Sequence, residues 1–243
     1  MWWSYNRMSV TQRPSLQWLR LATVHGALAP LIIKRRGEII QMVHGAIILC
    51  GGKSSRMGRD KATLPFGPEQ LLQRVVRLVS VVVEPAKIVV VAAANQSLPQ
   101  LPAAVTVVHD LASERGPLEG LAAGLRGLSQ RADAAYATAC DVPFIAPPFI
   151  ARMFALLGDY DIVVPRDSQH HHPLAAVYRL SVLPQVQRLL DEDRLRPRFL
   201  FHEANTREVD VQQLREIDPQ LATLQNLNYP HDYQAALAVA GFV

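Results

Sequence analysis

The sequence predicts a three-layer α/β domain with a mostly parallel central sheet. From Met42 onward, short apolar runs alternate with amphipathic stretches, and no internal repeat, low-complexity tract or linker interrupts the alternation. Such alternation of strands and helices places a parallel sheet between two layers of helices. The chain has 243 residues, of which 49% are hydrophobic and 19% charged, so it suffices for one substantial core or for one core with a small appendage.

The elements follow one another in a regular order. Apolar runs with the length and composition of strands lie at residues 46–49, 87–92, 105–108, 134–138, 161–165, 174–178 and 207–211. Apolar residues recur at helical spacing over residues 70–82, 116–128, 147–157 and 181–192, and we expect a further helix over residues 194–202. In sheets of this kind, ligands bind beyond the carboxyl ends of the strands.

The first 41 residues differ from the rest of the chain. They carry six basic residues and one acidic residue, whereas the remainder carries 19 basic and 20 acidic residues. We expect residues 1–41 to be an extension, either loosely ordered or the product of a start codon assigned upstream of Met42, and residues 42–243 to be the domain. The apolar stretch 27–33 is broken by Pro30 and is too short to span a membrane. The balanced charge of the remainder argues against nucleic-acid binding.

The loop after the first strand of the domain has the composition of a phosphate-binding site. Residues 49–61 read LCGGKSSRMGRDK, but a P-loop ending at "GKS" would need glycine where Ile47 stands. Glycines allow backbone N–H groups to approach an anion, and the serines, arginines and lysines add donors. The alternative is an ordinary strand-to-helix turn with surface charge.

Two aspartates follow later strands. Asp110 ends the run TVVHD, and Asp141 follows the run YATAC. We expect these aspartates to end neighbouring strands and both carboxylates to face the basic loop, as a Mg²⁺–triphosphate site requires. A single aspartate after a strand commonly serves only as a helix cap or turn residue. The two cysteines, Cys50 and Cys140, form no metal-type pair and are expected to be small buried residues in a reducing cytosol.

These residues resemble a known family. LCGGKSSRMGRDKATLPFG (49–67) resembles the signature of molybdenum cofactor guanylyltransferases, which have a Rossmann-like nucleotidyltransferase fold. Shorter matches follow in family order: RGPLEGLAAGL (115–125), ACDVPF (139–144), HPLAAVYR (172–179) and NLNYPHDY (226–233). The resemblance covers about residues 43–240. It implies a cytoplasmic enzyme that uses Mg²⁺ to transfer GMP from GTP to the terminal phosphate of molybdopterin or molybdenum-molybdopterin, releasing pyrophosphate. A further expected partner is a protein that delivers molybdopterin.

The resemblance also implies roles for individual residues. Lys61, Arg56 and Asp141 form the expected catalytic set, in which Arg56 and Lys61 neutralise the triphosphate. Asp141 and Asp110 are the expected metal ligands, and Asn226 and Asn228 close the site from the C-terminal side. The nucleotide is expected to contact Leu49, Cys50, Gly51, Gly52, Lys61, Asp110 and Asp141.

The acceptor side is less defined by sequence. Three adjacent histidines, His170 to His172, cannot all face one ion from a strand, because successive side chains point to opposite faces. We expect His172 to line the acceptor pocket and its neighbours to be solvated. Arg196 and Arg198 either meet the acceptor phosphate or coat a surface.

Three residues depart from the family pattern. Cys50 stands in place of alanine, Tyr229 in place of threonine and His231 in place of glutamate. Cytidylyltransferases acting on the same cofactor tend to carry L-A-A-G where this chain has L-C-G-G, so Gly51 favours GTP over CTP. The sequence is also compatible with a sugar-phosphate nucleotidyltransferase and with a nucleotide-binding cofactor carrier without turnover.

Overall fold

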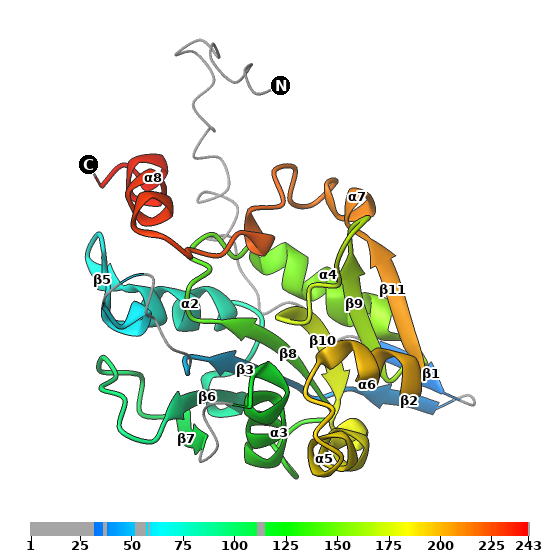
Figure 1. The fold of residues 1–243 in the computed structure, drawn as a ribbon. Coiled ribbons are helices and arrows are strands. Elements are labelled where there is room, and N and C mark those ends of the chain that lie inside the picture. The colour runs from blue at the N-terminus through cyan, green and yellow to red at the C-terminus, as the bar shows by residue number, and fades with distance from the viewer. Residues whose placement is uncertain (1–31, 36–37, 52–56, 58, 111–114, 243) are drawn as a thin grey trace.

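The fold is built on a twisted sheet with helices on both faces (Figure 1). The computed structural model describes residues 32–35, 38–51, 57, 59–110 and 115–242, and within them a seven-stranded sheet has the order β11-β9-β10-β8-β3-β6-β7. Its strands are β3 (His44–Leu49), β6 (Ile88–Ala93), β7 (Thr106–Asp110), β8 (Ala134–Ala139), β9 (Ile162–Arg166), β10 (Ala175–Arg179) and β11 (Thr206–Asp210).

Strand direction agrees with the predicted, mostly parallel sheet. β10 runs antiparallel to both of its neighbours, β8 and β9. The other strand pairs of this sheet are parallel. The seven strand runs predicted from sequence are therefore confirmed, and one strand is reversed among them.

Two helical layers bury the two faces of the sheet. α2 (Leu71–Val79) and α4 (Pro147–Leu157) cover one face, and α3 (Pro117–Gly127), α5 (Leu183–Asp191) and α6 (Pro197–Glu203) cover the other. Along β3, Ile48 packs into the first layer and Ile47 into the second, and both are fully buried. Because both faces of the sheet are covered, the central strands are apolar throughout, which is why they appear as continuous runs in the sequence.

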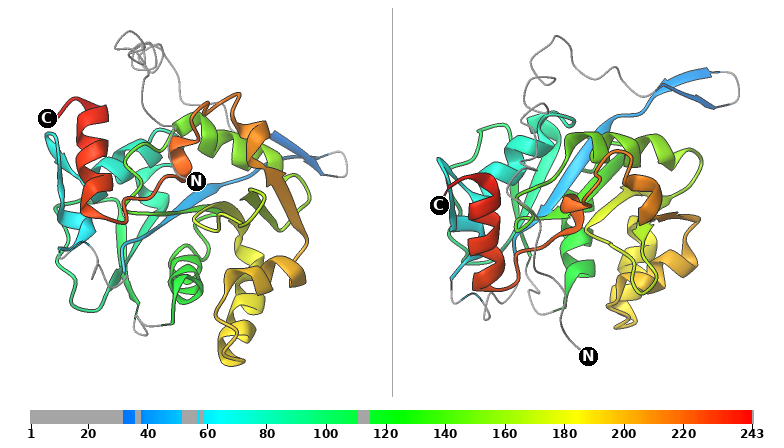
Figure 2. Two further views of the ribbon diagram at one scale, coloured as in Figure 1. Left: turned by 45° about the horizontal axis from the view of Figure 1, so that its top comes forward. Right: turned by 90° about the horizontal axis from the view of Figure 1, so that it is seen from above.

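Smaller elements surround the central sheet. β1 (Ile32–Arg35) and β2 (Glu38–Gln41) form a separate antiparallel hairpin that projects from the main body (Figure 2). β4 (Pro65–Phe66) and β5 (Glu69–Gln70) form a second hairpin, which the sequence did not predict. α7 (Val211–Leu214) follows β11, and α8 (Pro230–Ala240) lies near the C-terminus. Residues 1–31 are outside the described part, and the boundary at residue 42 stays a prediction.

The helix predicted over residues 194–202 is displaced. It begins at Pro197, with Arg196 in an extended conformation as its N-cap, because proline is favoured in the first turn and disfavours helix in the residue before it. Arg194 instead pairs with Glu192 and Glu203.

Within the described part of the chain, no helix has both the length and the apolar composition needed to cross a bilayer.

Helix α3 lies unusually close to β3, and one glycine permits this. A Cβ built on Gly124 would lie 2.4 Å from Cγ2 of Ile47. We expect Gly124→Ala to lower the free energy of unfolding by about 1–3 kcal/mol, because overpacking outweighs the helix propensity that alanine adds. Urea unfolding at equilibrium measures the change.

Gly120→Ala is the matched control in the same helix. Its Cβ would lie 3.2 Å from Cδ2 of Leu49, so a small side-chain adjustment suffices and the loss should be clearly smaller. Equal unfolding midpoints for the two variants would contradict the close-packing explanation.

Candidate active site

The candidate site lies at the carboxyl edge of the sheet, where β3 and β8 end side by side. Leu49 pairs with Ala139, and the N–H of Cys140 donates to the carbonyl of Leu49 at 3.0 Å. The chain leaves β3 through Cys50 and leaves β8 through Asp141. β10 starts at the same edge, since it runs antiparallel and its Ala175 pairs with Thr138. This edge is where open α/β sheets bind ligands.

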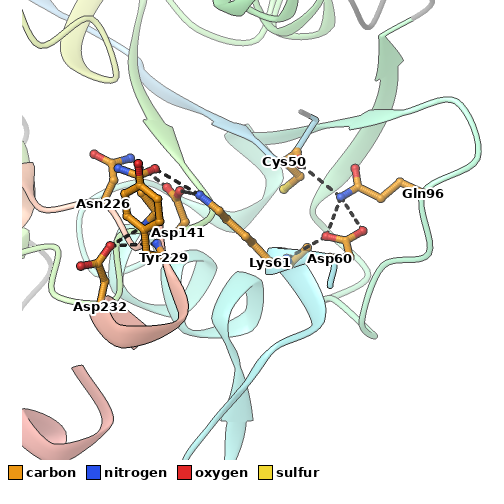
Figure 3. A network of polar contacts seen from close by, with 10 residues as sticks. Cys50, Asp60, Lys61, Gln96, Asp141, Asn226, Tyr229 and Asp232 are labelled. Carbon is orange, nitrogen blue, oxygen red and sulfur yellow. Dashed lines mark hydrogen bonds and ion pairs between the residues drawn. The ribbon is translucent and has the colours of Figure 1, made fainter. Parts of the chain in front are cut away.

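Lys61, Asp141 and Asn226 meet at this edge (Figure 3), and Asn228 joins them. Nζ of Lys61 lies 2.6 Å from Oδ2 of Asp141 and donates to Oδ1 of Asn228 at 3.3 Å. Nδ2 of Asn226 donates to the other carboxylate oxygen of Asp141 at 2.9 Å. Asp141 is only 6% exposed, so its charge is compensated by Lys61 rather than by bulk water. The structure thus joins four residues that the sequence assigned to one site.

Backbone contacts between the two asparagines and directly after them hold this segment in place. Between them, the N–H of Leu227 donates to the carbonyl of Asp141 at 3.0 Å. After them, Asp232, the third residue of α8, accepts from the N–H of Asn228 at 3.0 Å and from that of the N-cap Tyr229 at 2.8 Å, as part of a capping box. The tail therefore reaches Asp141 through both side chains and backbone.

A small apolar cluster anchors this tail to the rest of the fold. The cluster joins the β4–β5 hairpin, which follows Lys61, to α8, and these two elements lie side by side in Figures 1 and 2. The hydroxyl of Tyr233 on α8 also donates to the carbonyl of Pro65. Its buried members are Leu64, Phe66, Leu71, Leu227 and Ala236.

Lys61 is positioned from the N-terminal side by Asp60. Asp60 is the N-cap of the short 3-10 helix Lys61–Thr63, and its Oδ1 accepts from the N–H of Ala62 at 2.9 Å. The amide nitrogen of Gln96 donates to both oxygens of the same carboxylate, at 3.0 and 2.8 Å. Gln96 could not be predicted from the sequence, because the surrounding stretch AAANQSLP matches no motif.

The fold is that of a known group of proteins. The chain matches the MobA-like NTP transferase domain over residues 46–208. It belongs to this family. The matched range contains Lys61, Gln96 and Asp141, whereas Asn226 and Asn228 lie beyond it.

Curated relatives cover most of the transferase. A probable molybdenum cofactor guanylyltransferase of Pelotomaculum thermopropionicum is 31% identical over 80% of this chain and 92% of its own length. A molybdenum cofactor guanylyltransferase of Desulfosudis oleivorans is 31% identical over 79% and 93%, respectively. A solved structure, molybdopterin-guanine dinucleotide biosynthesis protein A from Archaeoglobus fulgidus, superposes with a TM-score of 0.67 at 21% identity and covers 83% of this chain and 100% of its own. That likeness shows the shared fold.

The strand order corrects one premise about the transferase's aspartates. Asp110 ends β7 and Asp141 follows β8, but β3 and β6 lie between these strands, so the two are not neighbours. Three inter-strand spacings of about 4.8 Å separate the two strands by roughly 14 Å. One ion does not span such a separation, whereas a bound nucleotide does. The side chain of Asp110 is outside the described part of the structure.

The remaining predicted nucleotide residues are placed unevenly. Gly52 and Arg56 lie outside the described residues. Leu49 is buried against α3, so only its backbone is available at the site. Gly51 is exposed, and among the described residues a Cβ built on it would meet the backbone nitrogen of Ala93 at 3.6 Å and the carbonyl carbon of Ala92 at 4.0 Å. The described part of the fold therefore does not require glycine at position 51.

The histidine triplet lies in the β9–β10 connection, at the same edge of the sheet. His172 contacts Oδ2 of Asp167 at 3.0 Å through Nε2, while His171 contacts Glu208 at 2.7 Å. Backbone N–H groups of residues 169 and 170 chiefly, with His172, lower the pKa of Asp167 to about 2. His171 also packs on Phe201, and its side chain is only 19% exposed, so the expectation that it is solvated is wrong.

The cysteines of the transferase are buried and free, as predicted. A hydrogen bond with the Cys140 side chain, followed by burial, raises the pKa of the Cys50 thiol well above its ordinary value. The thiol therefore stays protonated at neutral pH and is a poor nucleophile. The backbone of Cys50 is fixed at the end of β3, since its N–H donates to the carbonyl of Val91 at 2.8 Å and its carbonyl accepts from Gln96 at 3.1 Å.

We expect Cys50→Ala to leave turnover unchanged, because alanine keeps these backbone contacts and fits the same small space. Initial rates of pyrophosphate release measure this, with Cys140→Ala as the matched control from the adjacent strand. A loss of turnover in Cys50→Ala alone would assign the thiol a direct role.

Proposed function

We propose that this chain transfers GMP from GTP to the terminal phosphate of molybdopterin or molybdenum-molybdopterin and releases pyrophosphate. The observation that carries the proposal is the contact between Lys61 and Asp141 at the carboxyl edge of the sheet, closed by Asn226 and Asn228. The names of the curated relatives support the same substrates. In nucleotidyl transfer, the cation can stabilise the negative charge of the phosphates, and the carboxylate can bind the divalent metal that accompanies them.

The transfer needs positioning and charge stabilisation rather than a protein nucleophile. An oxygen of the acceptor phosphate attacks the α-phosphorus, and the bond to the bridging oxygen of pyrophosphate breaks. A phosphate monoester is largely ionised at neutral pH, so the attack needs no general base. Lys61 stabilises the charge that develops at the α-phosphate and on pyrophosphate, as preorganised cations do in transition states. Arg56 also follows β3 in the sequence, and together with Lys61 it neutralises the triphosphate.

The carboxylate of Asp141 fits a Mg²⁺ ligand. Among the described residues, each of its oxygens accepts one hydrogen bond, from Lys61 or from Asn226, which leaves a further lone pair on each, and Mg²⁺ commonly takes one carboxylate together with phosphate oxygens and water. When bound, Mg²⁺ supplies charge neutralisation at the phosphates. Asp110 ends β7, which lies three strand positions from β8, the strand that Asp141 follows. We therefore assign Asp110 to the nucleoside end of GTP rather than to the metal.

The remaining groups divide between the two substrates. Leu49, Cys50, Gly51 and Gly52 present backbone to the nucleotide, and the absence of a side chain at the exposed Gly51 leaves room for a purine. His172, Asn226 and Asn228 lie towards the acceptor, with Asp141 between the two halves. We place the reaction in the cytoplasm, with a molybdopterin-delivering protein as the partner.

A nucleotide competition assay tests the proposal. The full chain is incubated with Mg²⁺, molybdopterin and GTP, CTP or ATP, and pyrophosphate release is followed while mass spectrometry identifies the dinucleotide product. Preference for GTP supports the proposal. Preference for CTP assigns the chain to the cytidylyltransferases, and absence of release with all three indicates a sugar-phosphate acceptor or binding without turnover.

A further inference from the structure

Gln96 connects two segments that approach the candidate site from different parts of the chain (Figure 3). Its Nε2 donates to the carbonyl of Cys50 at 3.1 Å and to the carboxylate of Asp60 at 2.8 and 3.0 Å. Its Oε1 accepts from the N–H of Ala93 at 3.1 Å, which fixes the side chain to the end of β6. One side chain thus joins the end of β3, the end of β6 and the residue that precedes Lys61.

This bonding pattern requires a primary amide. An amide supplies two N–H donors and one carbonyl acceptor. In Gln96 the donors bond with the Cys50 carbonyl and the Asp60 carboxylate, and the acceptor bonds with the N–H of Ala93. A carboxylate at position 96 would face the carboxylate of Asp60, and an alkyl side chain would leave the carbonyl of Cys50 without this donor. The bonds to Asp60 are charge-assisted and therefore stronger than neutral ones.

The consequence of these bonds concerns the placement of Lys61. Asp60 caps the 3-10 helix in which Lys61 is the first residue, so the orientation of the Asp60 carboxylate sets the direction in which that helix starts. Gln96 fixes the carboxylate relative to β3, the strand that pairs with β8 and hence positions Asp141. The β3–β8 pair thereby fixes both Lys61, through Gln96 and Asp60, and its partner Asp141.

We propose that Gln96 is a positioning residue for nucleotidyl transfer, acting through Asp60 to hold Lys61 at the phosphates of the nucleotide. The proposal rests on the proposed role of Lys61. Gln96 need not touch either substrate. Its loss should impair nucleotide binding and turnover more than it impairs folding.

Gln73 offers a matched control elsewhere in the fold. Its Nε2 donates to the carbonyl of Gln100 at 2.9 Å, and its Oε1 accepts from the N–H of Gln70 at 2.9 Å. It is partly buried like Gln96, and these two partners are distinct from the residues that contact Lys61 or Asp141. Gln73→Ala and Gln96→Ala therefore remove comparable side-chain bridges, one away from the site and one beside it.

The test compares these two variants of the full chain by three measurements: the Kd of Mg–GTP by calorimetry, kcat and KM for GTP, and the urea midpoint. We expect Gln96→Ala to weaken Mg–GTP binding and to lower kcat/KM by about tenfold, on the scale of one lost charge-assisted hydrogen bond. Gln73→Ala should lower the urea midpoint without changing either kinetic constant. Equal kinetics in the two variants would overturn the proposal.

A rescue experiment separates positioning through Asp60 from general stabilisation. Gln96→Glu should reduce kcat/KM further than Gln96→Ala, because two carboxylates then face one another. Adding Asp60→Asn to Gln96→Glu should recover part of the loss, since the amide introduced at position 60 can donate to the carboxylate introduced at position 96. A double variant no better than Gln96→Glu would refute the route through Asp60.

The two proposals fail in different ways. If the wild-type chain binds Mg–GTP but releases no pyrophosphate with molybdopterin, the proposed function is wrong. The Gln96 proposal is then still decided by calorimetry, because Gln96→Ala must weaken Mg–GTP binding while Gln73→Ala must not.

Discussion

Asp141→Asn is expected to lower kcat by about 10²–10³-fold, the loss typical of removing one preorganised electrostatic group from an active site. The amide cannot serve as the proposed Mg²⁺ ligand with the strength of a carboxylate, and one end of it would place N–H groups against Lys61 or Asn226. The fold should survive, because the backbone carbonyl of residue 141 still accepts from Leu227. Initial rates over a range of Mg²⁺ concentrations measure the effect.

Asp218→Asn is the matched control for this prediction. Asp218 is as buried as Asp141, at 6% exposure, but it accepts from the backbone N–H groups of Ala222 and Thr223, away from Lys61. We expect its replacement to reduce stability and leave turnover intact. Turnover of Asp141→Asn close to that of Asp218→Asn would remove Asp141 from the mechanism.

Lys61→Ala is expected to lower kcat/KM for GTP by about 10²–10³-fold as well, since the transition state loses a cation that contacts the Asp141 carboxylate. The variant also leaves that carboxylate mostly buried and without its counter-charge, which destabilises the fold. Steady-state kinetics with GTP, run beside urea unfolding, separate these two effects.

The double variant Lys61→Ala with Asp141→Asn distinguishes chemistry from structure. If the ion pair serves only the fold, removing both charges should restore stability and turnover together. We expect stability to recover in part while turnover stays at or below that of Asp141→Asn alone, because the double variant lacks the Lys61 cation in addition to the proposed Mg²⁺ ligand. Recovery of turnover would show that Lys61 acts only as the counter-ion of Asp141.

The sequence predicted the strands well because burial on both faces makes them continuously apolar. It could not predict which strands pair. β6, β7 and β8 follow one another in the chain, but β8 lies on the other side of β3 from β6, so Asp110 and Asp141 end far-separated strands. Apolar periodicity reports which residues are buried and carries no information on neighbours in the sheet. The premise that the two aspartates follow neighbouring strands was wrong for this reason.

Family motifs predicted which residues of the candidate site come together, whereas a residue defined by long-range contacts alone could not be predicted. Lys61, Asp141, Asn226 and Asn228 were assigned from their resemblance to family motifs, and the structure brings them together. Gln96 bonds to residues 46 and 36 positions away, and such long-range contacts leave no local pattern. The hairpin of β4 and β5 was missed for a related reason, since strands of two residues show no periodicity.

The closure of the site by the C-terminal tail has a consequence for how the protein is made. The asparagine that contacts Lys61 follows it by 167 positions, and the one that contacts Asp141 follows it by 85. At typical rates of translation, about ten to thirty seconds pass between the synthesis of Lys61 and that of Asn228. All seven strands of the described sheet precede the tail, so a nascent chain can assemble its sheet while the site is still open. A chain that ends before residue 226 therefore lacks the contacts that Asn226 and Asn228 make with Asp141 and Lys61, and we expect it to lack turnover even where its sheet has formed.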